Sequence, residues 1–227
     1  MKVVVLGGTG LLGNELQKLD KELICFGKDL DITDFQNLYE KLMLIRPAII
    51  INAAAEINSI EIGENPYRAI NTNIIGAANV SKYCLDTKIR LAYISTDYIY
   101  NWEHGNNKEP DKVLPFNEYA WTKLGGECSS RLVENSCIIR TNFGAGEFPY
   151  EKAYSNLWTS KDYVDILAPR ILKAAKSNIQ GIINIGTERK TMLEFARRRN
   201  PEVKDAQFPY ERDFSLNTEF YDRIFNN

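Results

Sequence analysis

The chain begins with an apolar run that stops at a cluster of glycines. Residues 2–6 read KVVVL, residues 7–13 read GGTGLLG, and the helical pattern LLGNELQKL overlaps the end of that cluster. β-Branched residues favour a strand, and closely spaced glycines favour a tight turn. This stretch therefore predicts a strand, a glycine turn and a helix, the first unit of an α/β fold.

Short apolar runs and longer helical patterns continue to alternate along the chain. Strands are expected at 23–26, 48–52, 90–96, 136–141 and 181–186, and helices at 34–45, 65–85, 117–134, 163–176 and 191–199. The run at 48–52 is apolar almost throughout, as in strands buried on both faces. The alternation predicts a Rossmann-type doubly wound parallel sheet with right-handed crossovers.

The last third of the chain departs from this pattern. Residues 142–160 show no clear period, and the end of the chain reads as an irregular tail with no terminal helix after 214–221. We expect a dinucleotide-binding core over 1–141. We also expect a small, shortened C-terminal substrate lobe within 142–227, interleaved with the last strand and helices of the core.

Composition excludes several classes of function. The net charge is −2 and no extended basic run occurs, so nucleic acid is not an expected partner. No apolar run approaches the length of a membrane span, and we expect a cytoplasmic protein. The four cysteines are scattered and the one histidine is His104, so neither a disulfide framework nor a metal site is expected. Acid–base chemistry must come from tyrosine, lysine or carboxylates.

The glycine turn predicts a cofactor site, although glycine triplets also occur in ordinary flexible turns. Here the turn follows a strand and opens a helix, and that context favours binding of a dinucleotide pyrophosphate at the helix N-terminus. The expected contacts from this turn are Gly7, Thr9, Gly10, Leu11, Leu12 and Gly13.

The end of the second strand bears on the choice between NADPH and NADH. Many NAD-binding folds carry an acid there, but this chain has Gly27 and Lys28. Lys28 either neutralises the 2′-phosphate of NADPH or is a solvated loop residue. Asp31 and Ile32 are expected near the adenine with either cofactor.

A strand and the following helix supply candidate catalytic groups. Ser95 and Thr96 end the strand at 90–96, where ligands gather in parallel sheets, although they also suit an ordinary strand-closing turn. Tyr119 and Lys123 lie four residues apart on the helix. An ammonium group one turn away favours the phenolate, and lowering a tyrosine pKa by about 3 units corresponds to roughly 4 kcal/mol. Such a tyrosine can donate a proton to a carbonyl oxygen that Thr96 holds.

The same helix carries two further predictions. An apolar stripe lies nearly opposite Tyr119 and Lys123, which indicates that the Tyr/Lys face is not the main packing face; its members are Trp121, Leu124, Cys128 and Leu132. Gly125 and Gly126 lie inside the helix, where each costs up to ~1 kcal/mol relative to alanine. That cost suggests the close approach of another backbone.

These pieces resemble the extended short-chain dehydrogenase/reductases, in particular the dTDP-4-dehydrorhamnose reductase branch. The similar blocks run along nearly the whole chain and are GGTGLLG (7–13), DLDITD (29–34), IRPAIIINAAA (45–55), NTNIIGAANV (71–80), STDYIY (95–100), PFNEYAWTKLGGE (115–127), IIRT (138–141) and FSLNTEFY (214–221).

The resemblance implies a role for each matching position. Thr96, Tyr119 and Lys123 correspond to the catalytic triad, and Asn73 to an asparagine that shapes the site. The segment along the cofactor corresponds to Asn52, Ala53, Ala54 and Ala55. The family reduces the 4-keto group of a nucleotide-linked deoxysugar with NADPH or NADH, and its habits suggest a homodimer.

One comparison within that family narrows the reaction. Related dehydratases have Asp-Glu after the triad threonine, whereas Asp97 is followed here by Tyr98. Bifunctional epimerase/reductases place a cysteine near this turn, and residues 91–105 contain none. A plain reductase is therefore favoured over a dehydratase or an epimerase.

The substrate side is shorter than the family pattern, because only about twenty residues separate the strand at 136–141 from 162–172. The substrate pocket is therefore reduced or completed by another subunit. The expected substrate contacts are Ser95, Thr96, Asp97, Asn142, Phe143 and Arg212. Phe143 and Trp158 suit packing equally well, and Arg212 suits either a diphosphate or a structural salt bridge. His104 is expected in a surface loop.

Three functions remain open. The first is a nucleotide-sugar reductase and the second an epimerase or a reductase of another carbonyl compound. The third is a non-catalytic NAD(P)-binding regulatory subunit, which the shortened lobe favours and the intact triad disfavours.

Overall fold

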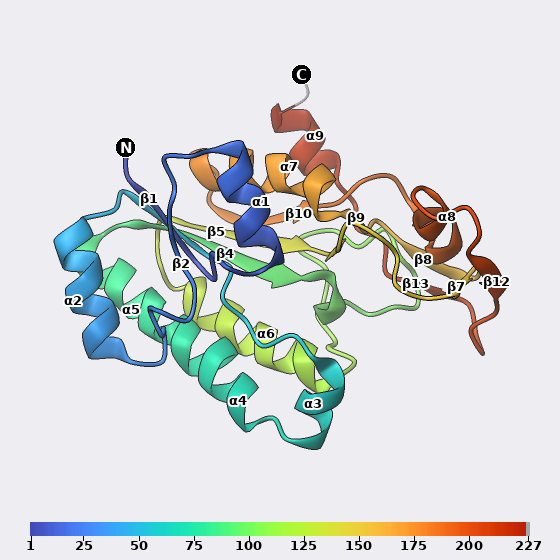
Figure 1. Ribbon diagram of the computed structural model, residues 1–227, viewed down its shortest axis with the longest axis horizontal. Helices are drawn as coiled ribbons and strands as arrows, with labels where there is room; N and C mark the ends of the chain where they lie inside the picture. The colour runs from blue at the N-terminus through green and yellow to red at the C-terminus, as the bar shows by residue number, and fades with distance from the viewer. Residues whose placement is uncertain (226–227) are drawn as a thin grey trace.

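The central layer of the computed structural model, which describes residues 1–225, is a parallel sheet with strand order β10-β5-β4-β3-β1-β2 (Figure 1). Its strands are β1 (Val3–Leu6), β2 (Ile24–Phe26), β3 (Ile49–Asn52), β4 (Arg90–Thr96), β5 (Ser136–Thr141) and β10 (Gly181–Ile185). All five pairings between neighbours are parallel. The predicted α/β class and doubly wound parallel sheet are confirmed.

Helices cover both faces of this sheet. α1 (Leu11–Leu19) and α7 (Val164–Lys176) lie on one face, and α2 (Phe35–Ile45), α5 (Ala77–Thr87) and α6 (Glu118–Ser130) lie on the other (Figure 1). The shorter helices are α3 (Ser59–Glu64), α4 (Tyr67–Ala69), the 3₁₀ turn Asp97–Ile99, α8 (Met192–Arg197) and α9 (Glu219–Phe225). No helix within 1–225 is long and apolar enough to cross a bilayer.

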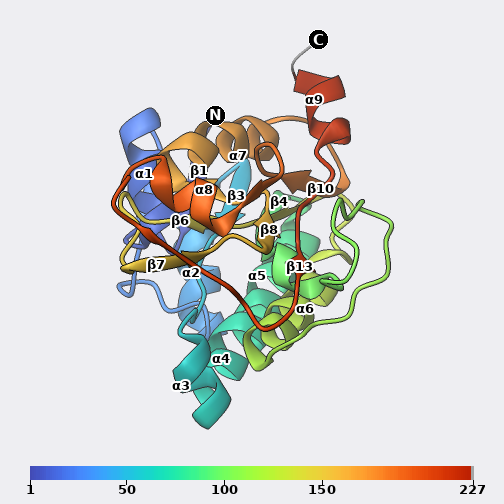
Figure 2. The ribbon, with the colours of Figure 1, turned by 90° about the vertical axis from the view of Figure 1, so that its right-hand side faces the viewer.

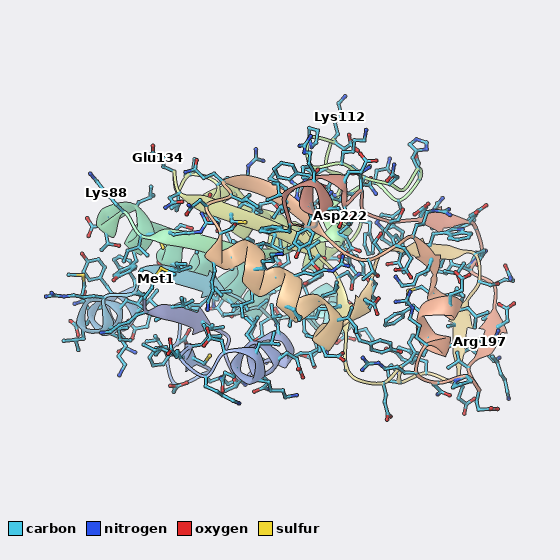
Figure 3. The ribbon with its side chains drawn as sticks, turned by 90° about the horizontal axis from the view of Figure 1, so that it is seen from above. Met1, Lys88, Lys112, Glu134, Arg197 and Asp222 are labelled. Carbon is cyan, nitrogen blue, oxygen red and sulfur yellow. The ribbon has the colours of Figure 1, made fainter. Side chains whose placement is uncertain are left out.

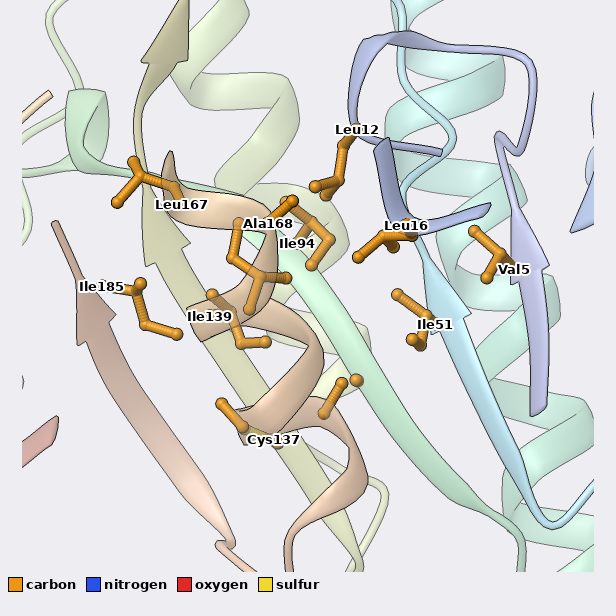
Figure 4. Packing of buried hydrophobic residues seen from close by; sticks show 14 of the residues in the cluster. Val5, Leu12, Leu16, Ile51, Ile94, Cys137, Ile139, Leu167, Ala168 and Ile185 are labelled. Atoms are coloured by element: carbon orange, nitrogen blue, oxygen red, sulfur yellow. The ribbon is translucent and has the colours of Figure 1, made fainter. Parts of the chain in front are cut away.

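The alternation of side chains along each strand divides the core into two layers. Val5, Ile51 and Ile94 point toward α1 and α7, where they meet Leu16 and Leu167 (Figure 4). The intervening strand residues point toward α2 and α5. Each sheet face thus buries an apolar surface, so the carboxyl ends of the strands are left to form a site.

A small lobe lies beyond the carboxyl ends of the strands, on the right in Figure 1 and toward the viewer in Figure 2. Its strands are β6 (Phe143–Gly144), β7 (Lys152–Tyr154), β8 (Leu157–Thr159), β9 (Asp162–Tyr163), β11 (Lys190–Thr191), β12 (Lys204–Ala206) and β13 (Arg212–Asp213). β7 pairs with β12, and β8 pairs with β11 and β13. Figure 3 places Arg197 of this lobe at the end of the molecule opposite Met1.

The end of the chain is more ordered than expected. The prediction of an irregular tail without a terminal helix is wrong, because β12, β13 and α9 form there. Tyr221 of α9 is 3% exposed and belongs to the core layer of α1 and α7. Local apolar periodicity does not show these elements because pairing with β7, β8 and the core stabilises them.

The reading of the faces of α6 is also wrong. Trp121 is 56% exposed and Leu132 is 73% exposed, while Lys123 is 3% exposed. The buried positions of the helix are Ala120, Thr122, Lys123, Gly126, Glu127 and Ser130. The helix packs through small and polar residues that have partners inside the protein, which an apolar stripe cannot reveal.

Candidate active site

A cavity of about 600 Å³ opens at the carboxyl ends of β1, β2 and β3. Its lining includes the expected cofactor residues Gly7, Thr9, Gly10, Lys28, Asp31, Ile32, Ala53, Ala54 and Ala55. Sequence reasoning did not name the other lining residues Gly27 (as a contact), Leu30, Thr33, Glu56, Arg68, Asn71 and Thr72. These come mainly from loops and from the helix before α5, where no periodic signal marks a binding role.

The glycine turn brings backbone to the cavity. Gly7 has φ +81°, and a Cβ there would lie 2.6 Å from the Ala54 nitrogen. Gly10 begins α1 without a side-chain cap, and the first turn of α1 holds no acid. Its amide N–H groups therefore suit an anion. Leu12 and Gly13 do not line the cavity, because Leu12 packs in the core and Gly13 packs against Gly8.

The side of the cavity next to β2 has no room for an acid at residue 27. A Cβ on Gly27 would lie 2.4 Å from Thr9 Oγ1. The nearby Asp29 accepts a hydrogen bond from the Gly27 amide at 2.7 Å, and Asp31 accepts one from Thr33 at 2.8 Å. Lys28 is exposed on the cavity wall. At the end of β2, where many NAD-binding folds carry an acid, this protein therefore has Gly27 and the cation Lys28.

Thr96, Tyr119 and Lys123 meet at the ends of β4 and α6. Thr96 is 5% exposed, and its hydroxyl accepts a hydrogen bond from Tyr98 N at 3.2 Å and donates to Asp97 Oδ1 at 3.3 Å. The Lys123 ammonium lies 4.5 Å from the centroid of the Tyr93 ring. Asn117 caps α6 by accepting a hydrogen bond from Ala120 N at 2.8 Å, and so fixes the turn that carries Tyr119.

An aromatic group, Tyr98, Trp102, Phe116 and Phe214, covers this site. The Tyr98 ring meets Tyr119 edge-to-face at 6.3 Å, and Phe214 lies 5.0 Å from Trp102. Phe214 belongs to the block FSLNTEFY, so that C-terminal segment does reach the site. This aromatic group could not be predicted, because its members lie far apart in the chain.

Burial sets the charge states of the site. Burial raises the pKa of Tyr119 well above its ordinary value, Tyr98 and Asp97 add to the rise, and the Thr96 hydrogen bond opposes it. Burial also lowers the pKa of Lys123 to about 7, against the opposing charge of Glu127. The expected lowering of the Tyr119 pKa by Lys123 is therefore absent in the protein alone, because loss of water outweighs the attraction.

Asn73 lies in a π-helical segment, Ile70–Gly76, inside the helical stretch predicted over 65–85. Its side chain accepts a hydrogen bond from Glu56 N at 2.8 Å. It donates to Glu56 O and to Thr122 Oγ1, both at 2.9 Å. Asn73 thus ties the segment after β3 to α6, and the local widening of a π turn is common at functional sites.

The Ser95 hydroxyl is bound by a carboxylate of α6. Its hydroxyl donates to Glu127 Oε2 at 2.7 Å, and Glu127 also forms a buried ion pair with Arg140 at 2.6 Å. Neighbouring residues of a strand point to opposite faces, so Ser95 and Thr96 cannot both serve one site. Ser95 is a structural residue here, and the expectation of a substrate contact is not supported.

Asp97 and Asn142 do come together. Asp97 is 1% exposed, and its two oxygens accept from Asn142 Nδ2 at 3.0 and 3.1 Å. Burial raises the pKa of Asp97 to about 7, and Asn142 and the charge of Lys161 oppose that rise. Sequence reasoning missed Lys161, because a lone lysine in an irregular segment carries no pattern.

The remaining candidates lie elsewhere. The Arg212 guanidinium lies 5.0 Å from the Tyr210 ring and has no salt bridge among residues 1–225, so neither a diphosphate contact nor a structural salt bridge is supported for it. Phe143 packs against the core layer of α1 and α7. Trp158 donates to Glu211 at 3.0 Å under Arg189. His104 is on the surface, with a side chain that is 85% exposed.

No group of three or more histidine, cysteine or acidic residues within 1–225 could hold a metal ion. The four cysteines are free thiols: Cys25, Cys84, Cys128 and Cys137. The chemistry available at this site is therefore that of a phenol, an ammonium group, a hydroxyl and a carboxyl group.

The family described as RmlD substrate binding domain matches residues 1–172. Among curated proteins, a dTDP-4-keto-6-deoxy-D-glucose reductase of Streptomyces niveus is 31% identical over 61% of this chain and 51% of its own length. The methionine adenosyltransferase 2 subunit beta of Pongo abelii is 26% identical over 63% of this chain and 44% of its own. The chain thus spans about half the length of the curated relatives it matches.

Solved structures match over the whole chain. A hypothetical dTDP-4-dehydrorhamnose reductase from Sulfolobus tokodaii is 26% identical with a TM-score of 0.88, covering 100% of this chain and 96% of its own. A dTDP-4-dehydrorhamnose reductase from Bacillus anthracis in complex with NADP is 24% identical with a TM-score of 0.86, covering 99% and 92%. Because the Bacillus anthracis protein is only 24% identical, its similarity shows that the two chains share a fold.

Proposed function

Because the chain belongs to the RmlD substrate-binding-domain family, we propose that it reduces the 4-keto group of a nucleotide-linked deoxysugar with NADPH or NADH. The observation that carries the proposal is the meeting of three groups at the edge of the sheet. Thr96 is buried at the end of β4, Tyr119 lies in the first turn of α6 against the Tyr98 ring, and the buried Lys123 lies one helical turn further on.

The cavity fits the cofactor in three respects. The first turn of α1 offers amide groups without a side-chain cap, Gly7 has no room for a Cβ, and Asn52 Nδ2 is buried without a hydrogen-bond partner among the described residues. Lys28 with no acid at residue 27 favours NADPH over NADH. When bound, the nicotinamide supplies hydride to the substrate carbon. Lys123 and Tyr119 would hold its ribose, as the family resemblance implies.

The raised pKa of Tyr119 keeps its phenol protonated at neutral pH, as a proton donor requires. Its proton would pass to the keto oxygen, which the Thr96 hydroxyl would hold. Lys123, with a pKa of about 7, would stabilise the phenolate that remains after the transfer.

We assign the cofactor to residues 1–141 and the substrate mainly to the lobe within 142–227. Asp97 and Asn142 are the proposed substrate-side residues, because Asn142 holds Asp97 directly beside Thr96. A cytoplasmic location fits the four free thiols and a reduced cofactor.

A homodimer is proposed through the outer face of α6. Trp121 and Cys128 are exposed on that helix, Leu132 is exposed just after its C-terminus, and Ile75 is 45% exposed. An apolar row of this kind suits a second copy of the chain, which would meet it around a two-fold axis.

A regulatory subunit without catalytic activity is the second candidate. The likeness to methionine adenosyltransferase 2 subunit beta favours it, as does the shortened lobe. The intact set of Thr96, Tyr119 and Lys123 favours the reductase, because a subunit without catalytic activity does not need a proton donor. An epimerase or a reductase of another carbonyl compound would be revealed by its products.

The test compares the wild type with Tyr119→Phe, using NADPH oxidation with a panel of nucleotide-linked 4-keto sugars and product analysis. Tyr119→Phe should lower turnover at least about 100-fold and leave the Kd for NADPH within about threefold. Equal turnover by the two proteins contradicts the assignment. NADPH binding without oxidation, together with co-purification of another enzyme, identifies the regulatory subunit.

A further inference from the structure

Lys161 directly precedes β9, and its ammonium group has no hydrogen-bond or ion-pair partner within residues 1–225. Lys161 Nζ lies 5.7 Å from the centroid of the Phe195 ring. The residue is only partly exposed, and burial lowers its pKa. Desolvation of an unpaired ammonium group costs free energy, which a bound anion would recover.

Several other cations of the lobe have carboxylate partners. They are Arg189 with Asp213, Lys190 and Arg198 with Asp162, and Arg199 with Asp165. These pairs hold the lobe together. Lys161 takes no part in them, so its position has no comparable structural explanation.

The pairing of β6 with β9 places Lys161 beside the proposed substrate residues. Phe143 and Asp162 are partners in this parallel pair, so the preceding residues, Asn142 and Lys161, enter it next to each other. Asn142 donates to Asp97, and the charge of Lys161 lowers the pKa of Asp97. Lys161 is thus close to the carboxyl group that directly follows Thr96.

The stem of Lys161 is held by close packing. A Cβ on Gly144 would lie 3.4 Å from Lys161 Cε and 3.1 Å from the Phe195 ring. The aliphatic carbons therefore run between Gly144 and Phe195, and the head group extends past them. A lysine can bury its aliphatic stem in this way while its charged head remains available to a ligand.

We propose that Lys161 binds a phosphate of the nucleoside diphosphate carried by the substrate. The proposal rests on the proposed function, because it takes the substrate to be a nucleotide sugar. Asp97 is not a sufficient counter-ion for the Lys161 ammonium group, because its oxygens already accept hydrogen bonds from Asn142 and Thr96. Arg212, expected at the diphosphate from the sequence, lies instead against Tyr210.

The experiment measures binding of dTDP and of thymidine to the NADP⁺-loaded protein by calorimetry. Lys161→Met should weaken dTDP binding about tenfold or more, and Lys161→Arg should stay within about threefold of the wild type. Lys152→Met, at an exposed position of β7, is the matched control and should bind dTDP as the wild type does. NADPH affinity and thermal unfolding of each variant show that the fold and the cofactor site are intact.

Three results would overturn the proposal: no binding of dTDP to the wild type, equal dTDP affinity in Lys161→Met, or an equal loss for thymidine and dTDP. The proposed function is judged separately. If Tyr119→Phe loses turnover while Lys161→Met keeps its dTDP affinity, the function stands and this proposal falls. If dTDP binding depends on Lys161 but no keto sugar is reduced, the function falls and this proposal stands.

Discussion

Gly126 allows a direct test of how α6 is held against the site. A Cβ on Gly126 would lie 2.3 Å from the Asn73 carbonyl oxygen and 2.3 Å from the Tyr93 hydroxyl. The adjacent Gly125 differs, because a Cβ there would meet the flexible side chain of Ile74 at 2.9 Å. Gly126→Ala and Gly125→Ala are therefore the same change in the same helix with different obstacles.

The two variants should differ clearly in stability. Glycine to alanine inside a helix gains up to about 1 kcal/mol, and overpacking costs about 1–3 kcal/mol. Gly126→Ala belongs at the upper end of that cost because a backbone carbonyl and a buried tyrosine cannot move easily. Its net effect is a loss of about 2 kcal/mol, or about 4–8 °C in Tm for a chain of this length. For Gly125→Ala the two effects nearly cancel, to within about 1 kcal/mol.

Urea denaturation and thermal unfolding of both variants measure this difference, with NADPH affinity as a second readout. Gly126→Ala should also weaken turnover, since displacing the Asn73 carbonyl disturbs the link between α6 and the segment after β3. If Gly126→Ala is as stable as Gly125→Ala, α6 does not approach the helix before it as closely as described, and the reasoning fails.

Two further predictions concern charge and assembly. Because the pKa of Lys123 is lowered to about 7 in the folded protein, the unfolded chain binds this proton more tightly than the folded one. The buried charge therefore lowers the free energy of unfolding by its full amount below about pH 7. This loss of stability disappears as the pH rises toward the ordinary lysine pKa. Lys123→Met without cofactor should therefore exceed the wild type in stability at pH 6, by at most about 5 kcal/mol, with a smaller difference at pH 9; a constant difference in urea titrations contradicts this. Trp121→Glu should convert a dimer to a monomer in light scattering while Leu19→Glu, exposed on α1, leaves the mass unchanged. A monomeric wild type refutes the dimer.

The elements of the core could be predicted because each carries its own local signal. β5 occupies 136–141 as expected, since a β-branched run between polar residues marks a strand by itself. The elements after residue 211 could not be predicted in this way. α9 and β13 are short and gain their stability from Tyr221 in the core and from β8, so nothing local marks them.

At the candidate site, the identity of the residues could be predicted but their ionisation could not. Thr96, Tyr119 and Lys123 were identified from spacing and resemblance, and the structure brings them together. Their ionisation was not predictable, because the pKa of Tyr119 depends on burial by an aromatic group drawn from distant segments. Ser95 shows the opposite error, since a motif does not tell which of two adjacent hydroxyls faces the ligand.

Two strands of the small lobe depend on residues that are synthesised about 50 positions later. β7 pairs with β12, and Asn156 near β8 exchanges hydrogen bonds with Phe208, 52 residues later. During synthesis, the strands that form the glycine turn and the cofactor cavity emerge first. β7 and β8 cannot complete their pairing until β12 and β13 have been synthesised. We therefore expect the cofactor cavity to fold before the lobe does. A nascent chain should then bind the nucleotide cofactor before it can bind the sugar substrate.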